Sequence, residues 1–136
     1  TGTMNPNDQI TPITPQRFID TRQGDSWDLS STGEAEVGRY RPQETRMFNI
    51  GAALGSDITG IIANFTAVTP DGSNHLTAWP CDSPHEPPPN TSMLNYNTAW
   101  SATPGNSIQA LSADGNLCVY SYAATDIIID ITAILR

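Results

Sequence analysis

The histidines and carboxylates are the side chains of this chain that could carry out catalysis. His75 follows a turn, His85 lies among prolines, and the chain has no G-x-S-x-G nucleophile motif. A catalytic histidine needs an orienting partner and a cleft, so we interpret both histidines as exposed loop residues. Two carboxylates could together hydrolyse a glycosidic bond, and Asp20 and Asp130 both lie in apolar runs. Pairing with arginine explains such carboxylates better, and the sequence therefore predicts a protein that is not an enzyme.

Asp130 interrupts the run 126–135, in which isoleucine is the commonest residue. A carboxylate in such a run needs a partner, because an unpaired buried charge is costly. Arg17 or Arg22 is the natural candidate for that partner. We predict that Arg17, Asp20, Arg22 and Asp130 form structural ion pairs.

Two Asp-Gly turns offer oxygen atoms to a metal ion, DGSN at 71–74 and DGN at 114–116. Calcium takes six to eight oxygens, and neither turn has an acidic residue at the far end of an EF-type loop. Local turn chemistry explains both, since Asp and Asn accept backbone hydrogen bonds and Gly adopts positive φ. We predict no metal and no cofactor, with calcium at these turns as the alternative.

The two cysteines, Cys81 and Cys118, lie in strand-like stretches and lack CxxC spacing. A zinc site needs further ligands, which the two histidines are poorly placed to supply. A disulfide is therefore predicted, and it indicates an oxidising environment. Closing a loop of this length would stabilise the fold by about 4 kcal/mol in the chain-entropy model. The alternative is a pair of buried free thiols.

Aromatic residues could stack against sugar rings, with Asn and Asp side chains bonding the hydroxyl groups. Trp27 and Trp100 lie in polar loops, whereas Trp79 alternates with Cys81 and is predicted to pack beside the disulfide. The alternative is that the aromatic side chains fill the space between sheets or a contact between subunits. The residues that we predict to contact a ligand or partner are Trp27, Tyr40, Tyr96 and Trp100.

The net charge argues against one class of partner. The 136 residues include 14 acidic side chains and 6 arginines, with no lysine, which gives a formal net charge of −8. Nucleic-acid binding needs a basic patch to neutralise phosphates, and an anionic membrane would repel this chain. An apolar stretch of about 18 residues and a charged N-terminal leader are both missing, so we expect no membrane span.

The pattern of elements that must hold these residues is that of an all-β fold. Short β-rich runs alternate with turns rich in Gly, Pro, Asn and Asp, and no sustained 3.6-residue period occurs. We predict one antiparallel β-sandwich or jelly-roll-like domain over 10–136, with long loops and one disulfide. A flexible or partner-binding arm at 1–9 precedes it, and Pro12 and Pro15 confine the first strand to an edge.

Two Asp-Gly turns each separate a pair of β-rich runs, which are 60–69 with 75–79 and 106–111 with 117–122. Asp-Gly between β-rich runs is typical of a hairpin, so we predict two hairpins. The run 126–135 is apolar on both faces over several residues, which predicts a central strand covered on both sides.

Six short motifs occur in order along the chain, which are PQRFIDTR at 15–22, NFT at 64–66, LTAWPC at 76–81, SMLNY at 92–96, DGNLCVYS at 114–121 and DIIIDIT at 126–132. Together they resemble an uncharacterised β-rich domain of secreted actinobacterial proteins and actinophage virion proteins. The resemblance covers about residues 10–135 and implies a β-rich fold with a Cys81–Cys118 pairing. It supplies no catalytic residue. Relatives carry a basic residue soon after the Trp-Pro-Cys motif, whereas 82–86 is acidic here.

These observations lead to two hypotheses for function. The first is a non-catalytic surface module for attachment or recognition, with glycan or cell-wall material as its partner. The second is a structural protein of an assembly, such as a phage capsid decoration or tail surface protein, with a neighbouring subunit as its partner. Either would act outside the cell or on a virion surface, and a homo-oligomer fits the second.

Overall fold

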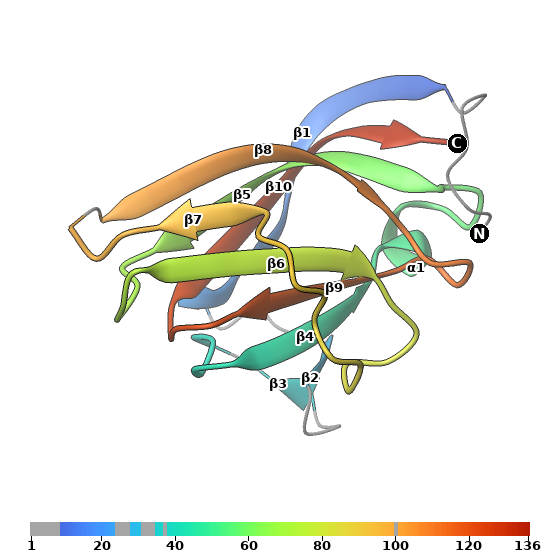
Figure 1. Ribbon diagram of the computed structural model, residues 1–136. Helices are drawn as coiled ribbons and strands as arrows, with labels where there is room; N and C mark the ends of the chain where they lie inside the picture. Colours follow the sequence, from blue (N-terminus) through green and yellow to red (C-terminus); the bar gives the residue numbers. More distant parts are fainter. Residues whose placement is uncertain (1–8, 24–27, 31–34, 37, 100) are drawn as a thin grey trace.

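The computed structural model describes residues 9–23, 28–30, 35–36, 38–99 and 101–136. Two antiparallel sheets pack against one another, which confirms the predicted β-sandwich (Figure 1). The four-stranded sheet has, in spatial order, β1 (Ile10–Asp20), β10 (Asp126–Leu135), β5 (Gly60–Val68) and β8 (Ala102–Ala110).

The second sheet is six-stranded and closes the other side of the core. Its order is β3 (Ala35–Glu36), β2 (Asp28–Ser30), β4 (Glu44–Asn49), β9 (Asn116–Ser121), β6 (Asn74–Pro80) and β7 (Leu94–Tyr96). Two short helical segments complete the described elements, the 3₁₀ turn η1 (Thr21–Gln23) and the helix α1 (Ile50–Leu54).

Alternating apolar residues build the core between the sheets. In β5 the side chains of Ile61, Ala63 and Phe65 alternate with half-buried ones, and all three are fully buried. Leu117 and Val119 of β9 face them from the other sheet within the same cluster. This period of two is what a strand with one buried face requires. Removal of this apolar surface from water is the main force that holds the two sheets together.

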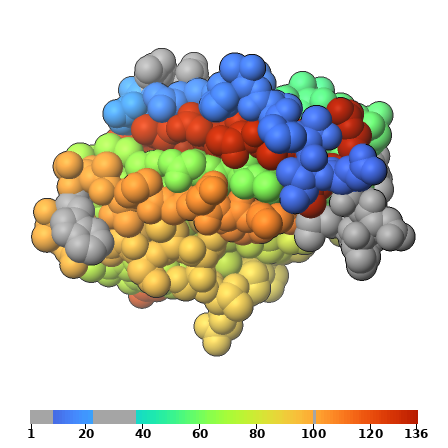
Figure 2. All heavy atoms as spheres, turned by 90° about the horizontal axis from the view of Figure 1, so that it is seen from above, coloured from blue at the N-terminus to red at the C-terminus, as the bar shows by residue number. Residues whose placement is uncertain are grey.

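β10 is a central strand, as predicted, because it lies between β1 and β5. Its residues Ile127, Ile129 and Ile131 are buried in the core. The prediction that both faces are covered is wrong for the middle of the strand, where Asp130 and Thr132 are only half-buried. Figure 2 shows why, since β1, β10, β5 and β8 lie side by side at the surface of the molecule.

Both predicted hairpins are wrong, because each Asp-Gly turn passes from one sheet to the other. β5 pairs with β10 and β8, whereas β6 pairs with β9 and β7. β8 and β9 likewise belong to different sheets. A two-residue type I′ hairpin needs positive φ at both central residues, but Gly72 does not adopt it. In the connection between β5 and β6, Thr69 is the residue that adopts positive φ, at 48°.

The first strand lies at an edge of its sheet, as its prolines predict. Its pairing with β10 shifts register between Pro12 and Gln16 and again between Arg17 and Ile19. Of the arm predicted at 1–9, residues 1–8 lie outside the described part of the chain. Gln9 exchanges two backbone hydrogen bonds with Arg136, at 2.9 and 3.2 Å.

Candidate functional site

A surface hollow of about 290 Å³ is the best candidate for a binding site. It lies where the β5–β6 and β9–β10 connections meet the segment before β4, and we call it the Tyr122 hollow. Its lining consists of Pro42, Asp71, Gly72, Ser73, Asn74, Tyr122, Ala123 and Ala124. Turns from three distant parts of the chain therefore form one surface.

Backbone hydrogen bonds fix these three segments to one another. The Asp71 N–H donates to the carbonyl of Ala124 at 2.9 Å, and the Gln43 N–H donates to that of Tyr122 at 3.0 Å. Tyr122 in turn donates its own N–H to the carbonyl of His75 at 3.3 Å. The hollow is thus held in shape before any ligand arrives.

Arg39 joins the two turns with its guanidinium group. Its Nη2 donates to Oδ1 of Asp71 at 2.9 Å and also to the carbonyl of Thr69. Its Nη1 donates to Oδ2 of Asp126 at 3.0 Å, at the start of β10. A planar guanidinium suits such a junction because its donors have fixed directions. The sequence analysis missed this role, and no local pattern around Arg39 signals it.

Tyr122 presents an aromatic surface at the hollow, with 45% of the residue exposed. The His75 ring lies near two tyrosine rings. Its centroid is 6.1 Å from that of Tyr122 and 6.2 Å from that of Tyr120. Burial raises the pKa of Tyr120, with smaller contributions from neighbouring tyrosines, so its hydroxyl stays protonated at neutral pH. His75 Nδ1 and Asn74 Oδ1 are 2.7 Å apart, which orients the imidazole. The result is a small aromatic cluster with one exposed ring.

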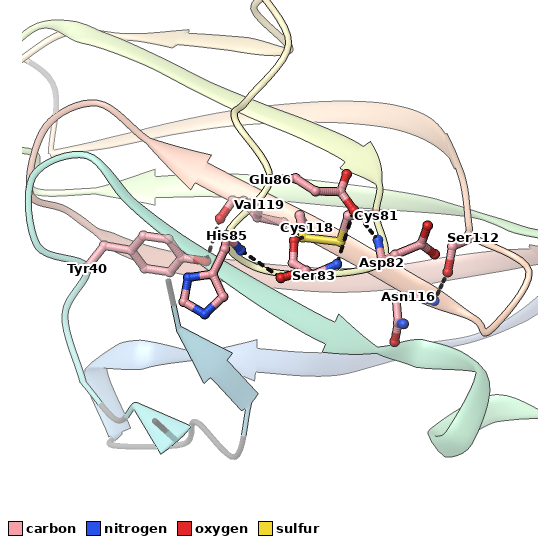
Figure 3. Close-up of a disulfide and its surroundings, with 10 residues drawn as sticks. All are labelled: Tyr40, Cys81, Asp82, Ser83, His85, Glu86, Ser112, Asn116, Cys118 and Val119. Carbon is pink, nitrogen blue, oxygen red and sulfur yellow. Dashed lines mark hydrogen bonds between the residues drawn. A yellow bond between two sulfur atoms is a disulfide. The ribbon is translucent and has the colours of Figure 1, made fainter. Parts of the chain in front are cut away.

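The structure corrects two of the four predicted contact residues. Tyr40 is 1% exposed and Tyr96 is 3% exposed, so neither presents a surface to a ligand. The Tyr40 hydroxyl donates to the carbonyl of Val119 at 3.1 Å (Figure 3), and that of Tyr96 lies 2.9 Å from the Ser121 hydroxyl. Both are core residues whose polar tips are satisfied internally. Trp27 and Trp100, the other two, lie outside the described residues.

The histidines differ from the prediction in one respect. His85 is exposed in the loop after Cys81, as expected, but His75 is half-buried on β6. The reason is that β6 begins at Asn74 and places His75 against the two tyrosines. Its ring contacts an amide and aromatic rings, none of which is the carboxylate that typically orients a catalytic imidazole.

The Cys81–Cys118 disulfide is present, as predicted, and excludes the alternative of free thiols. It joins the residue after β6 to the middle of β9, with Trp79 packed against it. Figure 3 shows the loop that follows Cys81 beside this bond. In that loop Glu86 Oε2 accepts hydrogen bonds from the N–H groups of Asp82 and Ser83, at 2.6 and 3.1 Å.

The predicted ion pairs are also present. Arg17 Nε lies 2.9 Å from Asp130 Oδ1, so Arg17 rather than Arg22 is the partner of Asp130. Arg22 instead holds the buried carboxylate of Asp20 at 2.9 Å, and Arg17 approaches the same carboxylate at 3.5 Å. The hydrogen bond from the Arg22 side chain holds the pKa of Asp20 below its usual value, against the opposing effect of burial.

A second buried ion pair was missed by the sequence analysis. Arg46 is 1% exposed and Glu44 is 4% exposed, with Arg46 Nε 2.8 Å from Glu44 Oε2. The Arg46 guanidinium also lies 4.3 Å from the ring centroid of Tyr40. A signal was present, because alternation along β4 places Arg46 on the same face as Phe48, a core residue.

Metal binding and membrane insertion find no support in the described residues. No group of three His, Cys, Asp or Glu side chains there is placed to hold a metal ion. Asp114, at the second Asp-Gly turn, lines a separate hollow of about 250 Å³ without another carboxylate among the lining residues. None of the described helices has the length and apolar character needed to cross a bilayer.

Comparison of the chain with protein-family models, with curated proteins and with solved structures found no match. The geometry of the Tyr122 hollow and of the molecular surface is therefore what bears on function.

Proposed function

We propose that the protein is a non-catalytic surface module that binds glycan, such as cell-wall polysaccharide, through the Tyr122 hollow. The observation that carries the proposal is the exposed ring of Tyr122 in a hollow also lined by Asp71, Ser73 and Asn74. An aromatic face packs against the apolar face of a sugar ring, and nearby polar groups bond its hydroxyls.

The size of the hollow favours a small unit of a glycan. Its volume of about 290 Å³ is at the lower end of the range for ligand sites, which is about 300–1,000 Å³. One or two sugar rings at the end or side of a longer chain would fill it. Because hydrogen bonds already fix the three segments, binding requires little ordering of the protein.

Location outside the cell, or on the surface of a virion, is part of this proposal. The Cys81–Cys118 bond supports it, because disulfides persist in oxidising environments. A cell-wall ligand would be reached in the same environment.

The substitution Tyr122→Ala tests the proposal. We expect retention on insoluble cell-wall polysaccharide, or affinity in a glycan array, to weaken about tenfold, which corresponds to loss of one aromatic stacking contact. Ile108→Ala is the control, since Ile108 is exposed on the outer face of the four-stranded sheet and lies outside the hollow. Wild-type protein that binds no glycan, or a Tyr122→Ala variant that binds like wild type, would contradict the proposal.

A second candidate function is that of a structural protein in an assembly of identical copies. The observation in its favour is β8, an edge strand of nine residues without a charged side chain. The residues that flank β8, Ser101 and Leu111, form backbone hydrogen bonds with Thr69 and Thr59 at the ends of β5. Every second residue of an antiparallel strand bonds the same neighbour, so the backbone N–H and C=O groups of Asn106, Ile108 and Ala110 point away from β5. An open edge of this kind can pair with a second copy, which light scattering would detect.

A further inference from the structure

We infer that the Tyr122 hollow selects sugars that carry a free, protonated amino group, such as glucosamine, over neutral or acidic sugars. This inference rests on the proposed function and concerns the charge of the ligand. Three features support it. The arginines are paired with carboxylates, no donor among the described residues bonds the Oδ2 atom of Asp71, and Tyr122 lines the same hollow as that carboxylate.

The arginines of the chain are all paired with carboxylates. The pairs are Arg17 with Asp130, Arg22 with Asp20, Arg39 with Asp71 and Asp126, Arg41 and Arg46 with Glu44, and Arg136 with Asp57. Because the chain has no lysine, an acidic sugar or a phosphate group would find no arginine or lysine that lacks a carboxylate partner. The net charge of −8 repels such ligands at longer range as well.

Among the described residues that line the hollow, Asp71 is the charged one, and it carries a carboxylate. Arg39 divides its guanidinium group between two carboxylates, those of Asp71 and Asp126. The Asp71 side chain is 72% exposed and bonds Arg39 through Oδ1. Within the described part of the chain, no donor bonds its other oxygen, Oδ2. Among the described residues, therefore, nothing competes with a ligand for that oxygen.

An ammonium group is the ligand chemistry that uses both the carboxylate and the aromatic ring. A charge-assisted hydrogen bond from an amine to a carboxylate is about twice as strong as one from a hydroxyl. A cation near the face of a tyrosine ring is attracted by the ring quadrupole. Asp71 and Tyr122 line the same hollow, so one amino sugar can contact both. N-acetylation removes the charge and with it both interactions.

The experiment compares glucosamine oligomers with N-acetylglucosamine oligomers of the same length, by calorimetry at low salt. The pH lies between about 5 and 6, where an ordinary carboxyl is ionised and a primary amine is protonated. We expect the glucosamine oligomer to bind at least about tenfold more tightly. Its affinity should fall as salt is added, whereas residual binding of the acetylated oligomer should not.

The variant Asp71→Asn keeps the shape of the turn and removes the charge. It should abolish the preference for glucosamine, so that the ratio of the two affinities falls to about one. Asp114→Asn is the matched control, because Asp114 is exposed in the other Asp-Gly turn and does not line the hollow. Each variant is compared with the wild type only if the two melt at the same temperature. The salt dependence of wild-type binding tests the charge effect independently.

The outcomes separate this inference from the proposed function. Equal binding of both oligomers, with a loss in Tyr122→Ala and none in Asp71→Asn, would overturn the inference and leave glycan binding intact. Tighter binding of a polyuronate would overturn the inference as well. Absence of binding to every glycan tested would remove both.

Discussion

At the scale of single residues, the most consequential side chain is one that carries a charge in the core. Arg46 is fully buried, stacks on Tyr40, bonds Glu44 and donates to the carbonyls of Gly38 and Arg39 at 2.8 and 3.1 Å. All of its partners belong to β4 or to the segment that precedes it. Removal of this one side chain would leave two carbonyls without this donor and would take the buried cationic partner from the Glu44 carboxylate, which keeps the Arg41 N–H at 2.8 Å.

We predict that Arg46→Met lowers the free energy of unfolding by about 3–5 kcal/mol, the usual cost of breaking a buried pair from one side. Chemical denaturation measures the effect. The matched control is Arg41→Met, because Arg41 lies 3.8 Å from the same Glu44 but its side chain is 58% exposed. That change should cost less than about 1 kcal/mol. Equal losses in the two variants would contradict the importance of burial.

At the same scale, the sequence was informative where a charge interrupts an apolar run. Asp130 stands out among isoleucines, and its pairing with an arginine was predictable, although the sequence did not distinguish Arg17, the observed partner, from Arg22. The burial of Tyr40 and Tyr96 was not predictable, because a tyrosine in a polar stretch has the same local sequence pattern whether it is exposed or buried. Tyr40 precedes Arg41 and Pro42 in a polar segment, and contacts with distant residues, such as Val119 on β9 and the backbone of Thr125, place it in the core.

At the scale of elements, turns were easier to predict than the partners of the strands they join. An Asp-Gly turn shows where the chain reverses and leaves open whether the next strand pairs with the last or crosses to the other sheet. The choice depends on which strands are neighbours in space, as β10 is of β5. Such contacts are distant in sequence, and no local pattern records them.

The disulfide links the end of β6 to its neighbour β9 in the same sheet and has a predictable effect on stability. Cys81 and Cys118 have a sequence separation of 37, and the chain-entropy model gives about 4 kcal/mol for a loop of that length. We predict this loss in free energy of unfolding for the Cys81→Ser, Cys118→Ser double variant, measured by urea denaturation. Thiol labelling of the denatured, unreduced wild type should detect no reactive cysteine. Two labelled sites would show that the bond does not form.

At the scale of the whole molecule, the two sheets present edges of different kinds. β1 carries Pro12, Pro15 and the paired Arg17, which hinder extension of the sheet, and β3 and β7 are short. β8 is long and uncharged, with Pro104 as its single proline and Ile108 exposed. In a chain of net charge −8, this edge is where two copies approach with the least repulsion from side chains.

If the protein assembles through β8, Ile108→Lys should shift it toward the monomer in light scattering over a range of concentrations. Two lysines facing one another across a two-fold contact would repel. Ile10→Lys is the control, because Ile10 is equally exposed, at 55% against 57%, but lies on β1 at the opposite edge. A wild-type monomer at every concentration would remove assembly as a candidate function.

The backbone hydrogen bonds between Gln9 and Arg136 have a consequence for how a linker or a support can be attached to the domain. β10 begins next to the Arg39 junction at the Tyr122 hollow and ends beside Arg136, so its ten residues separate the two points by about 30 Å. Figure 1 shows the same strand running the length of the sandwich. A linker, a fusion partner or a solid support attached at either of these residues would leave from the end remote from the hollow. Immobilised that way, the protein would keep its ligand-facing end directed outward.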